Sequence, residues 1–213
     1  MKKYRLIILF ALLNCLNGYA QRRQIPDIQR TKADNIQSDS INLSPNSDFE
    51  KKVGLKPINE TSNTNEVRFY KRNELSGTRN LKIIAVKDSI WTAVEYAEQN
   101  YPIKIKKYRL KSEQGQLRSL MRLLLNQNLA YLPNQKELEP KMKKYTDTIR
   151  GRAEKKIIVS DGESYTVEFK IGDNFRIYSF YNPKTYSEFY DDVQELKDYV
   201  AIVNLFENQL KRE

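Results

Sequence analysis

The pattern of residues in the C-terminal third constrains the fold most. Residues 165–170 and 175–181 each alternate apolar and polar side chains, and the turn sequence Gly172-Asp173-Asn174 separates the two runs. A period of two indicates strands with one buried face, and so short a turn indicates an antiparallel hairpin. The β-rich run 156–160 comes before a second turn sequence, Asp161-Gly162. We therefore predict a three-stranded antiparallel meander.

An amphipathic helix is predicted to follow the meander. Asn182 and Pro183 are favoured residues for the N-cap and the first turn of a helix. Apolar residues then recur at intervals of three and four, at Phe189, Val193, Leu196, Val200 and Val203. A stripe of this kind requires a sheet or another helix to cover it, so the helix is expected to lie across the sheet.

The preceding part of the chain repeats this order of elements. Strands are predicted at 67–70, 81–86, 90–96 and 103–110, although Ala and Glu in the third run also suit the start of a helix. A helix should follow, with Ser112 as its N-cap and a leucine-rich stripe from Leu117 to Leu125. The expected fold is α+β: an antiparallel sheet, in two groups of about three strands, covered by two amphipathic helices, the second C-terminal.

The residues before this domain have a different composition. Residues 21–64 are rich in Asn, Ser, Asp and Gln, and their apolar residues are scattered singly. Such a segment buries too little apolar surface to offset the entropy lost on ordering. We predict a largely disordered tail over 21–64, in which one short segment could be held against the domain, and a single domain over 65–213.

The first twenty residues have the form of an export signal. Lys2, Lys3 and Arg5 precede an apolar stretch, and Gly18-Tyr19-Ala20 supplies the small residues of a cleavage site. We predict cleavage after Ala20 and a periplasmic or extracellular protein. The alternative is a lipoprotein anchored through Cys15. The apolar stretch is too short for a transmembrane helix, and no later segment of the sequence suits one.

The C-terminal pattern also resembles that of other proteins. The string Asp-Gly-Glu-Ser-Tyr-Thr-Val-Glu-Phe from Asp161, and Phe-Arg-Ile-Tyr-Ser-Phe-Tyr-Asn-Pro-Lys-Thr-Tyr from Phe175, resemble a pattern in small, uncharacterised exported proteins of Gram-negative bacteria. The loop Leu132-Pro133-Asn134-Gln135 belongs to the same resemblance. It implies a fold family and an envelope location, and it brings no activity.

Composition excludes several kinds of catalysis. The chain has no histidine, and its only cysteine is Cys15 in the predicted signal. Histidine- or cysteine-based triads and metal sites are therefore excluded, as is a disulfide framework, and no glycine-rich phosphate loop is present. We expect no metal and no cofactor. Carboxylates remain as acid–base groups, and they give the alternative hypothesis of a hydrolase acting on envelope glycan. The candidates are Glu163, Glu168, Asp173, Asp191, Asp192 and Glu195, each of which also suits a polar strand or helix face.

Positive charge is concentrated in the middle of the domain. Residues 104–156 contain 15 Lys and Arg against 5 Asp and Glu, whereas residues 157–213 contain 6 against 11. The densest group comprises Lys104, Lys106, Lys107, Arg109 and Lys111. Clustered charge favours association with a partner of opposite sign, such as anionic envelope lipid or glycan, or an acidic protein. Export removes the usual nucleic-acid partner. A purely solvated face is the simpler interpretation.

These features lead to a hypothesis of function. We expect a non-enzymatic binding or accessory module of the envelope with a basic contact surface, of unknown oligomeric state. A structural or stress-protective role is a third possibility. Asp39-Ser40-Ile41, Asp88-Ser89-Ile90 and Asp147-Thr148-Ile149 resemble an acceptor pattern for O-glycosylation, and Ser40 is the predicted modification site.

Overall fold

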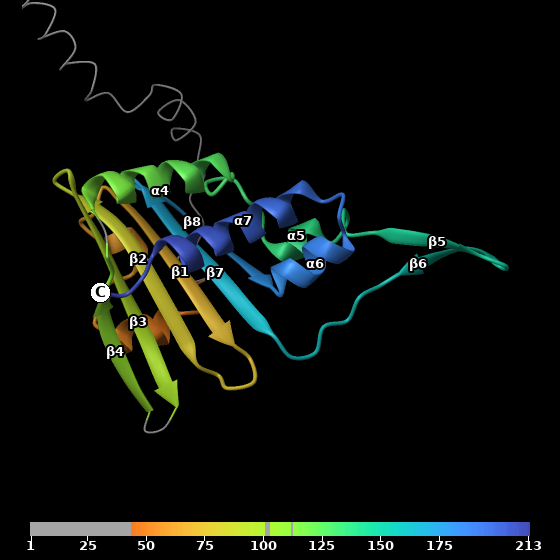
Figure 1. The fold of residues 1–213 in the computed structure, drawn as a ribbon, viewed down its shortest axis with the longest axis horizontal. Coiled ribbons are helices and arrows are strands. Elements are labelled where there is room, and N and C mark those ends of the chain that lie inside the picture. Colours follow the sequence, from red (N-terminus) through yellow and green to blue (C-terminus); the bar gives the residue numbers. More distant parts are fainter. Residues whose placement is uncertain (1–43, 101–102, 112) are drawn as a thin grey trace, which may run out of the picture. The chain divides into compact units, whose positions relative to one another are not determined.

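A computed structural model describes residues 44–100, 103–111 and 113–213 (Figure 1). Its centre is a six-stranded antiparallel sheet with the order β4-β3-β2-β1-β7-β8. The strands are β1 (Asn65–Asn73), β2 (Arg79–Lys87), β3 (Ile90–Asn100), β4 (Ile103–Arg109), β7 (Glu163–Ile171) and β8 (Asn174–Tyr181). The predicted α+β class is confirmed. The two predicted groups of strands form one sheet, because β1 pairs with β7 over its whole length.

The strand predictions were right for most runs and wrong for one. Residues 90–96 are strand β3, so the helical alternative for them is wrong. Residues 156–160 form no strand, and Ile158 within them is 92% exposed. The Asp161-Gly162 turn therefore opens no hairpin, and the second group has two strands in the sheet. The short apolar run lies instead in a connection to β7 from a separate hairpin, β5 (Lys144–Thr148) with β6 (Gly151–Lys155).

Helices cover one face of the sheet, as the apolar stripes predicted (Figure 1). α4 (Gln114–Asn126) buries Leu117, Leu120 and Leu124, and its N-cap is Glu113, whereas Ser112 lies outside the described residues. The C-terminal stripe is divided between α6 (Pro183–Phe189) and α7 (Gln194–Gln209). The prediction of one continuous helix is therefore wrong. The apolar spacing continues across the break between Phe189 and Gln194, because Tyr190 and Val193 are buried in the same core as the two helices.

A segment before β1 covers part of the opposite face. It contains α3 (Ser47–Lys52) and the 3-10 turn η2 (Ile58–Glu60). Phe49 of α3 is fully buried against residues of β1, β2 and β3, and Ile58 is fully buried against β8. The ordered domain thus includes residues from 44 onward rather than from 65. The remainder of the predicted tail, and the predicted signal, lie outside the described residues.

Candidate functional site

A group of charged side chains is buried between the sheet and the segment before β1. Side chains alternate along β1, so Val67 and Phe69 enter the core under the helices, while Arg68 and Tyr70 face α3. Arg68 is completely buried, and its two carboxylate partners Glu50 and Glu66 are each at least 95% buried. A buried guanidinium is stable only when its charge and its donors are matched.

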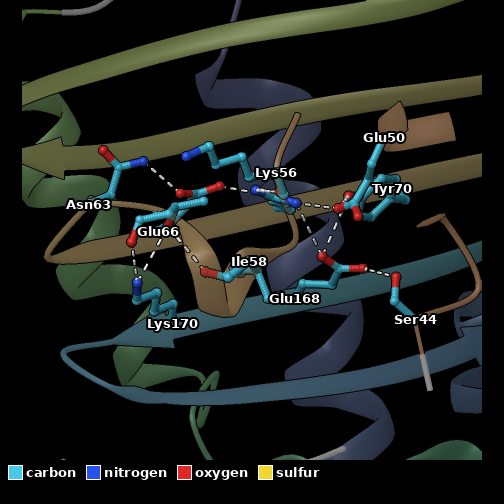
Figure 2. A network of polar contacts seen from close by, with 11 residues as sticks. Ser44, Glu50, Lys56, Ile58, Asn63, Glu66, Tyr70, Glu168 and Lys170 are labelled. Atoms are coloured by element: carbon cyan, nitrogen blue, oxygen red, sulfur yellow. Dashed lines mark hydrogen bonds and ion pairs between the residues drawn. The ribbon is translucent and has the colours of Figure 1, made fainter. Parts of the chain in front are cut away.

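Each nitrogen of the Arg68 guanidinium has a polar partner. Figure 2 shows that Glu50, Glu66 and Glu168 lie close together around this point. The Nε of Arg68 donates to Glu66 Oε1 at 2.6 Å, and its Nη1 forms an ion pair with Glu50 of α3. Its Nη2 donates to the carbonyl oxygen of Lys56 at 2.8 Å. The carboxylate of Glu168, on the neighbouring strand β7, lies 3.8 Å from Nη1. One arginine therefore joins α3, the segment after it and two central strands.

Glu168 is the carboxyl group in this cluster with the most perturbed proton affinity. Burial, followed by the charge of Glu50, raises the pKa of Glu168 to about 8. At neutral pH Glu168 is therefore largely protonated, and it shares a hydrogen bond with Glu50. Its other oxygen accepts from Ser44 Oγ at 2.6 Å, and Tyr70 Oη donates to Glu50 at 2.5 Å. The cluster is closed to solvent, so it acts as a clamp for the segment before β1 rather than as a site for a substrate.

Three of the candidate carboxylates, Glu163, Glu168 and Asp173, lie on or beside the β7–β8 hairpin but do not meet. Glu168 faces α3, whereas Glu163 lies at the start of β7 on the helix-covered face and pairs with Lys71 at 2.8 Å. Asp173 is exposed in the turn between β7 and β8. No shared pocket of these three groups exists in the described part of the chain.

The other three candidate carboxylates, Asp191, Asp192 and Glu195, lie around the junction of α6 and α7. Asp191 and Asp192 are exposed there, and Asp191 pairs with Lys144 at 3.2 Å. Glu195 forms an ion pair with Lys141, and this hydrogen bond lowers the pKa of Glu195. Lowered proton affinity suits a permanent ion pair better than a general acid.

The predicted basic residues lie on and after β4, which is one edge of the sheet. Lys104 and Lys106 share the helix-covered face, as predicted for a strand, whereas Lys107 and Arg109 project to the other face. Lys111 follows the strand and is exposed. The Lys107 ammonium stands 5.5 Å from the ring centroid of Tyr96 on the adjacent strand. The cluster is therefore a basic rim on both faces of one edge strand, which we call the β4 edge (residues 103–109).

A shallow depression of about 420 Å³ opens at the same edge. It is lined by Ala93, Val94, Lys107, Tyr108 and Arg109. Its position places two cations and an aromatic ring beside an open strand. This combination suits an anionic, extended ligand better than a compact substrate.

No family model, curated protein or solved structure matches this chain. In the described residues, none of the helices has the length and apolar character needed to cross a membrane.

The predicted modification pattern occurs at two exposed turns. Ser89 lies in the turn between β2 and β3, and Thr148 ends β5 at the turn to β6. Thr148 Oγ1 already donates to the carbonyl oxygen of Gly151 at 2.6 Å. The predicted site itself, Ser40, lies outside the described residues.

Of the four charged residues in this cluster, the sequence pattern singles out only Glu168. It gives no role to Glu66 and Arg68, because a polar residue in an alternating strand normally faces water, nor to Glu50, which lies in a polar segment. The available signal was the presence of Phe49 and Ile58 within a polar segment. Two large apolar residues there indicate a second buried face, on which the polar residues of β1 must find partners.

Proposed function

We propose that this protein is an exported, non-enzymatic binding or accessory module of the bacterial envelope, and that the β4 edge is its contact surface. The export signal of residues 1–20 supports the location. The basic rim supports the activity: Lys104, Lys106, Lys107 and Arg109 are all exposed on a strand of seven residues. The partner is anionic, with the chemistry of an acidic protein, an acidic glycan or an anionic lipid.

The observation that carries this proposal is the scarcity of neutralising groups along the rim. Arg109 has Glu213 at 3.7 Å, but among the described residues no carboxylate lies within 4 Å of Lys104, Lys106 or Lys107. Four cations held in register create a field that draws anionic partners and weakens with salt. A solvated face needs no such concentration on one strand.

The test compares charge reversal at two places on the domain. One variant changes Lys104, Lys106, Lys107 and Arg109 to Glu. The matched control changes four other exposed cations, Lys87, Arg118, Arg122 and Lys136, to Glu. Crosslinked pull-down from the native envelope should recover a partner with the parent and the control, and lose it with the first variant. Equal recovery by all three proteins would refute the proposal.

A further inference from the structure

The two edge strands of the sheet, β8 and β4, differ in whether their outward backbone groups already have hydrogen-bond partners. Along β8, the backbone N–H of Ser179 donates to Asn134 Oδ1 at 2.9 Å, and that of Tyr181 donates to Gln135 Oε1 at 2.6 Å. The loop before α5 (Gln135–Leu138) thus satisfies outward donors that a further strand would need. The β8 edge is closed to strand addition at these positions.

The β4 edge already carries the beginning of a seventh strand. The N–H of Lys111 donates to the carbonyl oxygen of Lys211 at 2.8 Å. The N–H of Glu213 donates to the carbonyl oxygen of Arg109 at 3.1 Å. Between these bonds, Leu110 and Arg212 form an antiparallel bridge. Arg212 is held in place by Glu95, to which its Nη2 donates at 2.6 Å. The end of β4 therefore accepts an added strand in ordinary antiparallel geometry.

The same ladder has open positions further along β4. Backbone groups of alternate residues point to the same side of a strand. Because Arg109 and Lys111 bond outward to residues 211–213, the outward groups next in line are those of Lys107 and Ile105. Among the described residues, no backbone group pairs with them. Two consecutive donor–acceptor positions are therefore available.

Charge decides what can occupy these positions. A second β4 edge would bring lysines opposite lysines, which is unfavourable and is a known protection of open edges. A strand with carboxylates on both of its faces would meet Lys104 and Lys106 on one side, and Lys107 and Arg109 on the other. Glu213 shows the arrangement within this chain, since its carboxylate lies 3.7 Å from the Nε of Arg109.

We propose that the β4 edge binds an extended acidic segment of a partner protein as an added antiparallel strand. The inference rests on the proposed function and names the partner class and the binding mode. Backbone hydrogen bonds to Ile105 and Lys107 supply affinity, and the lysines on both faces select for acidic side chains.

The experiment separates backbone pairing from charge attraction. The probe is a fluorescein-labelled peptide that repeats Glu-Glu-Thr-Thr, which places carboxylates on both faces of a strand. A peptide that repeats Lys-Lys-Thr-Thr is the negative control. The first variant is Lys107→Pro, which removes an outward N–H at an edge position where proline is tolerated. The matched control is Lys107→Gln, which removes the same charge and keeps the N–H. Fluorescence anisotropy gives the affinities.

Strand addition predicts that Lys107→Gln weakens binding a few-fold and that Lys107→Pro weakens it at least tenfold more. In the unsubstituted protein, bound peptide should slow amide hydrogen exchange of Ile105 and Lys107 at least tenfold, a readout that needs no variant. Equal binding by the two variants, without slowed exchange, would overturn strand addition. If the four-residue charge reversal still abolished binding in that case, the proposed function would stand without it. Unchanged binding after the charge reversal would count against both.

Discussion

At the scale of single residues, the Arg68 cluster decides how the two faces of the sheet are used. Three buried carboxyl groups, Glu50, Glu66 and Glu168, surround one buried guanidinium. Burial and the charge of Glu50 raise the pKa of Glu168 to about 8, which favours its uncharged form at neutral pH. A buried charge group of this kind adds little net stability over apolar packing, but removing one member leaves the others unpaired.

Arg68→Ala is expected to destabilise the protein by about 3–5 kcal/mol, because it leaves buried carboxylates without a cation. Urea unfolding followed by circular dichroism measures this change. Arg72→Ala on the same strand is the control, since the Arg72 side chain is 55% exposed and should matter by less than about 0.5 kcal/mol. Similar effects of the two substitutions would contradict the description of Arg68 as a clamp.

Glu168→Gln should change how stability depends on pH. The pKa of Glu168 is raised in the folded protein from its ordinary 4.5 to about 8, so the unfolded chain releases this proton first as pH rises. The contribution of Glu168 to stability therefore falls between about pH 4.5 and about pH 8. Glutamine keeps the geometry of the protonated acid, accepting from Ser44 and donating to Glu50. The variant should gain stability relative to the parent across this range, as measured by urea unfolding at several pH values. A difference that stays constant with pH would show that Glu168 is ionised in the fold.

The burial of these charged residues could not be predicted from the sequence. The alternation of Tyr165, Val167 and Phe169 correctly predicted one buried face of β7. The same alternation assigned Glu168 to a polar face, yet Glu168 is fully buried. A period of two separates two faces but does not reveal that a distant segment covers the second one.

At the scale of elements, the segment before β1 acts as a third layer. It is fastened by the Arg68 cluster, by Phe49 and Ile58, and by Lys170, whose Nζ donates to the carbonyl oxygen of Thr61 at 2.6 Å. Both apolar and polar contacts hold a segment whose composition alone suggested a tail.

Phe49→Ala is expected to destabilise the protein by about 3–5 kcal/mol, because it removes a fully buried ring and leaves a cavity against β1, β2 and β3. Thermal and urea unfolding measure the change. Lys51→Ala, at an exposed position of the same helix, should be nearly neutral. If Phe49→Ala were as mild as Lys51→Ala, the segment would not be part of the folded domain.

Asn134 fastens the other edge of the sheet. Its side chain accepts from Ser179 of β8, and its own N–H donates to Glu137 Oε2 at 3.1 Å. Asn134→Ala should cost about 1 kcal/mol, in the range of a lost cap or buried hydrogen bond, and should speed amide exchange at Ser179. Exchange at Ile177 on the same strand serves as the reference. Unchanged exchange at Ser179 would mean that the loop does not cover this edge.

Element types followed from local pattern, and their boundaries depended on the whole fold. The leucine stripe of α4 and the Asn182-Pro183 helix start were predicted correctly. The break between α6 and α7 was missed, since Tyr190 and Val193 stay buried on both sides of it. Ile157 and Ile158 suggested a strand at 156–160, but no strand in the described part of the chain pairs with it. Strand identity requires a partner, which local sequence does not specify.

At the scale of the whole molecule, the two sheet edges are protected by different means. Side chains of a loop cover β8, whereas positive charge protects β4. Charge protection leaves the backbone groups accessible, so it discriminates between partners rather than excluding all of them.

Replacing Lys104, Lys106 and Lys107 by Thr should increase self-association, because threonine favours strands and the repulsion between two such edges is removed. Sedimentation velocity over a range of protein concentrations measures this effect. The control replaces Lys87, Arg118 and Lys136, which are exposed elsewhere, by Thr. If neither variant associates more than the parent, charge is not what guards the β4 edge.

The pairing of β1 with β7 has a consequence for how fast the protein reaches this structure. Asn73 of β1 lies opposite Glu163 of β7. In the chain, β2, β3, β4, α4, α5 and the β5–β6 hairpin all come between these two residues. The entropy of closing so long a loop must be lost before the central pair is formed, and non-local pairing of this kind slows folding. The Arg68 cluster includes residues of both strands, so we expect its charges to remain hydrated until this pair forms. We expect refolding to be slow for a chain of this size, and Arg68→Ala to accelerate unfolding far more than it slows folding.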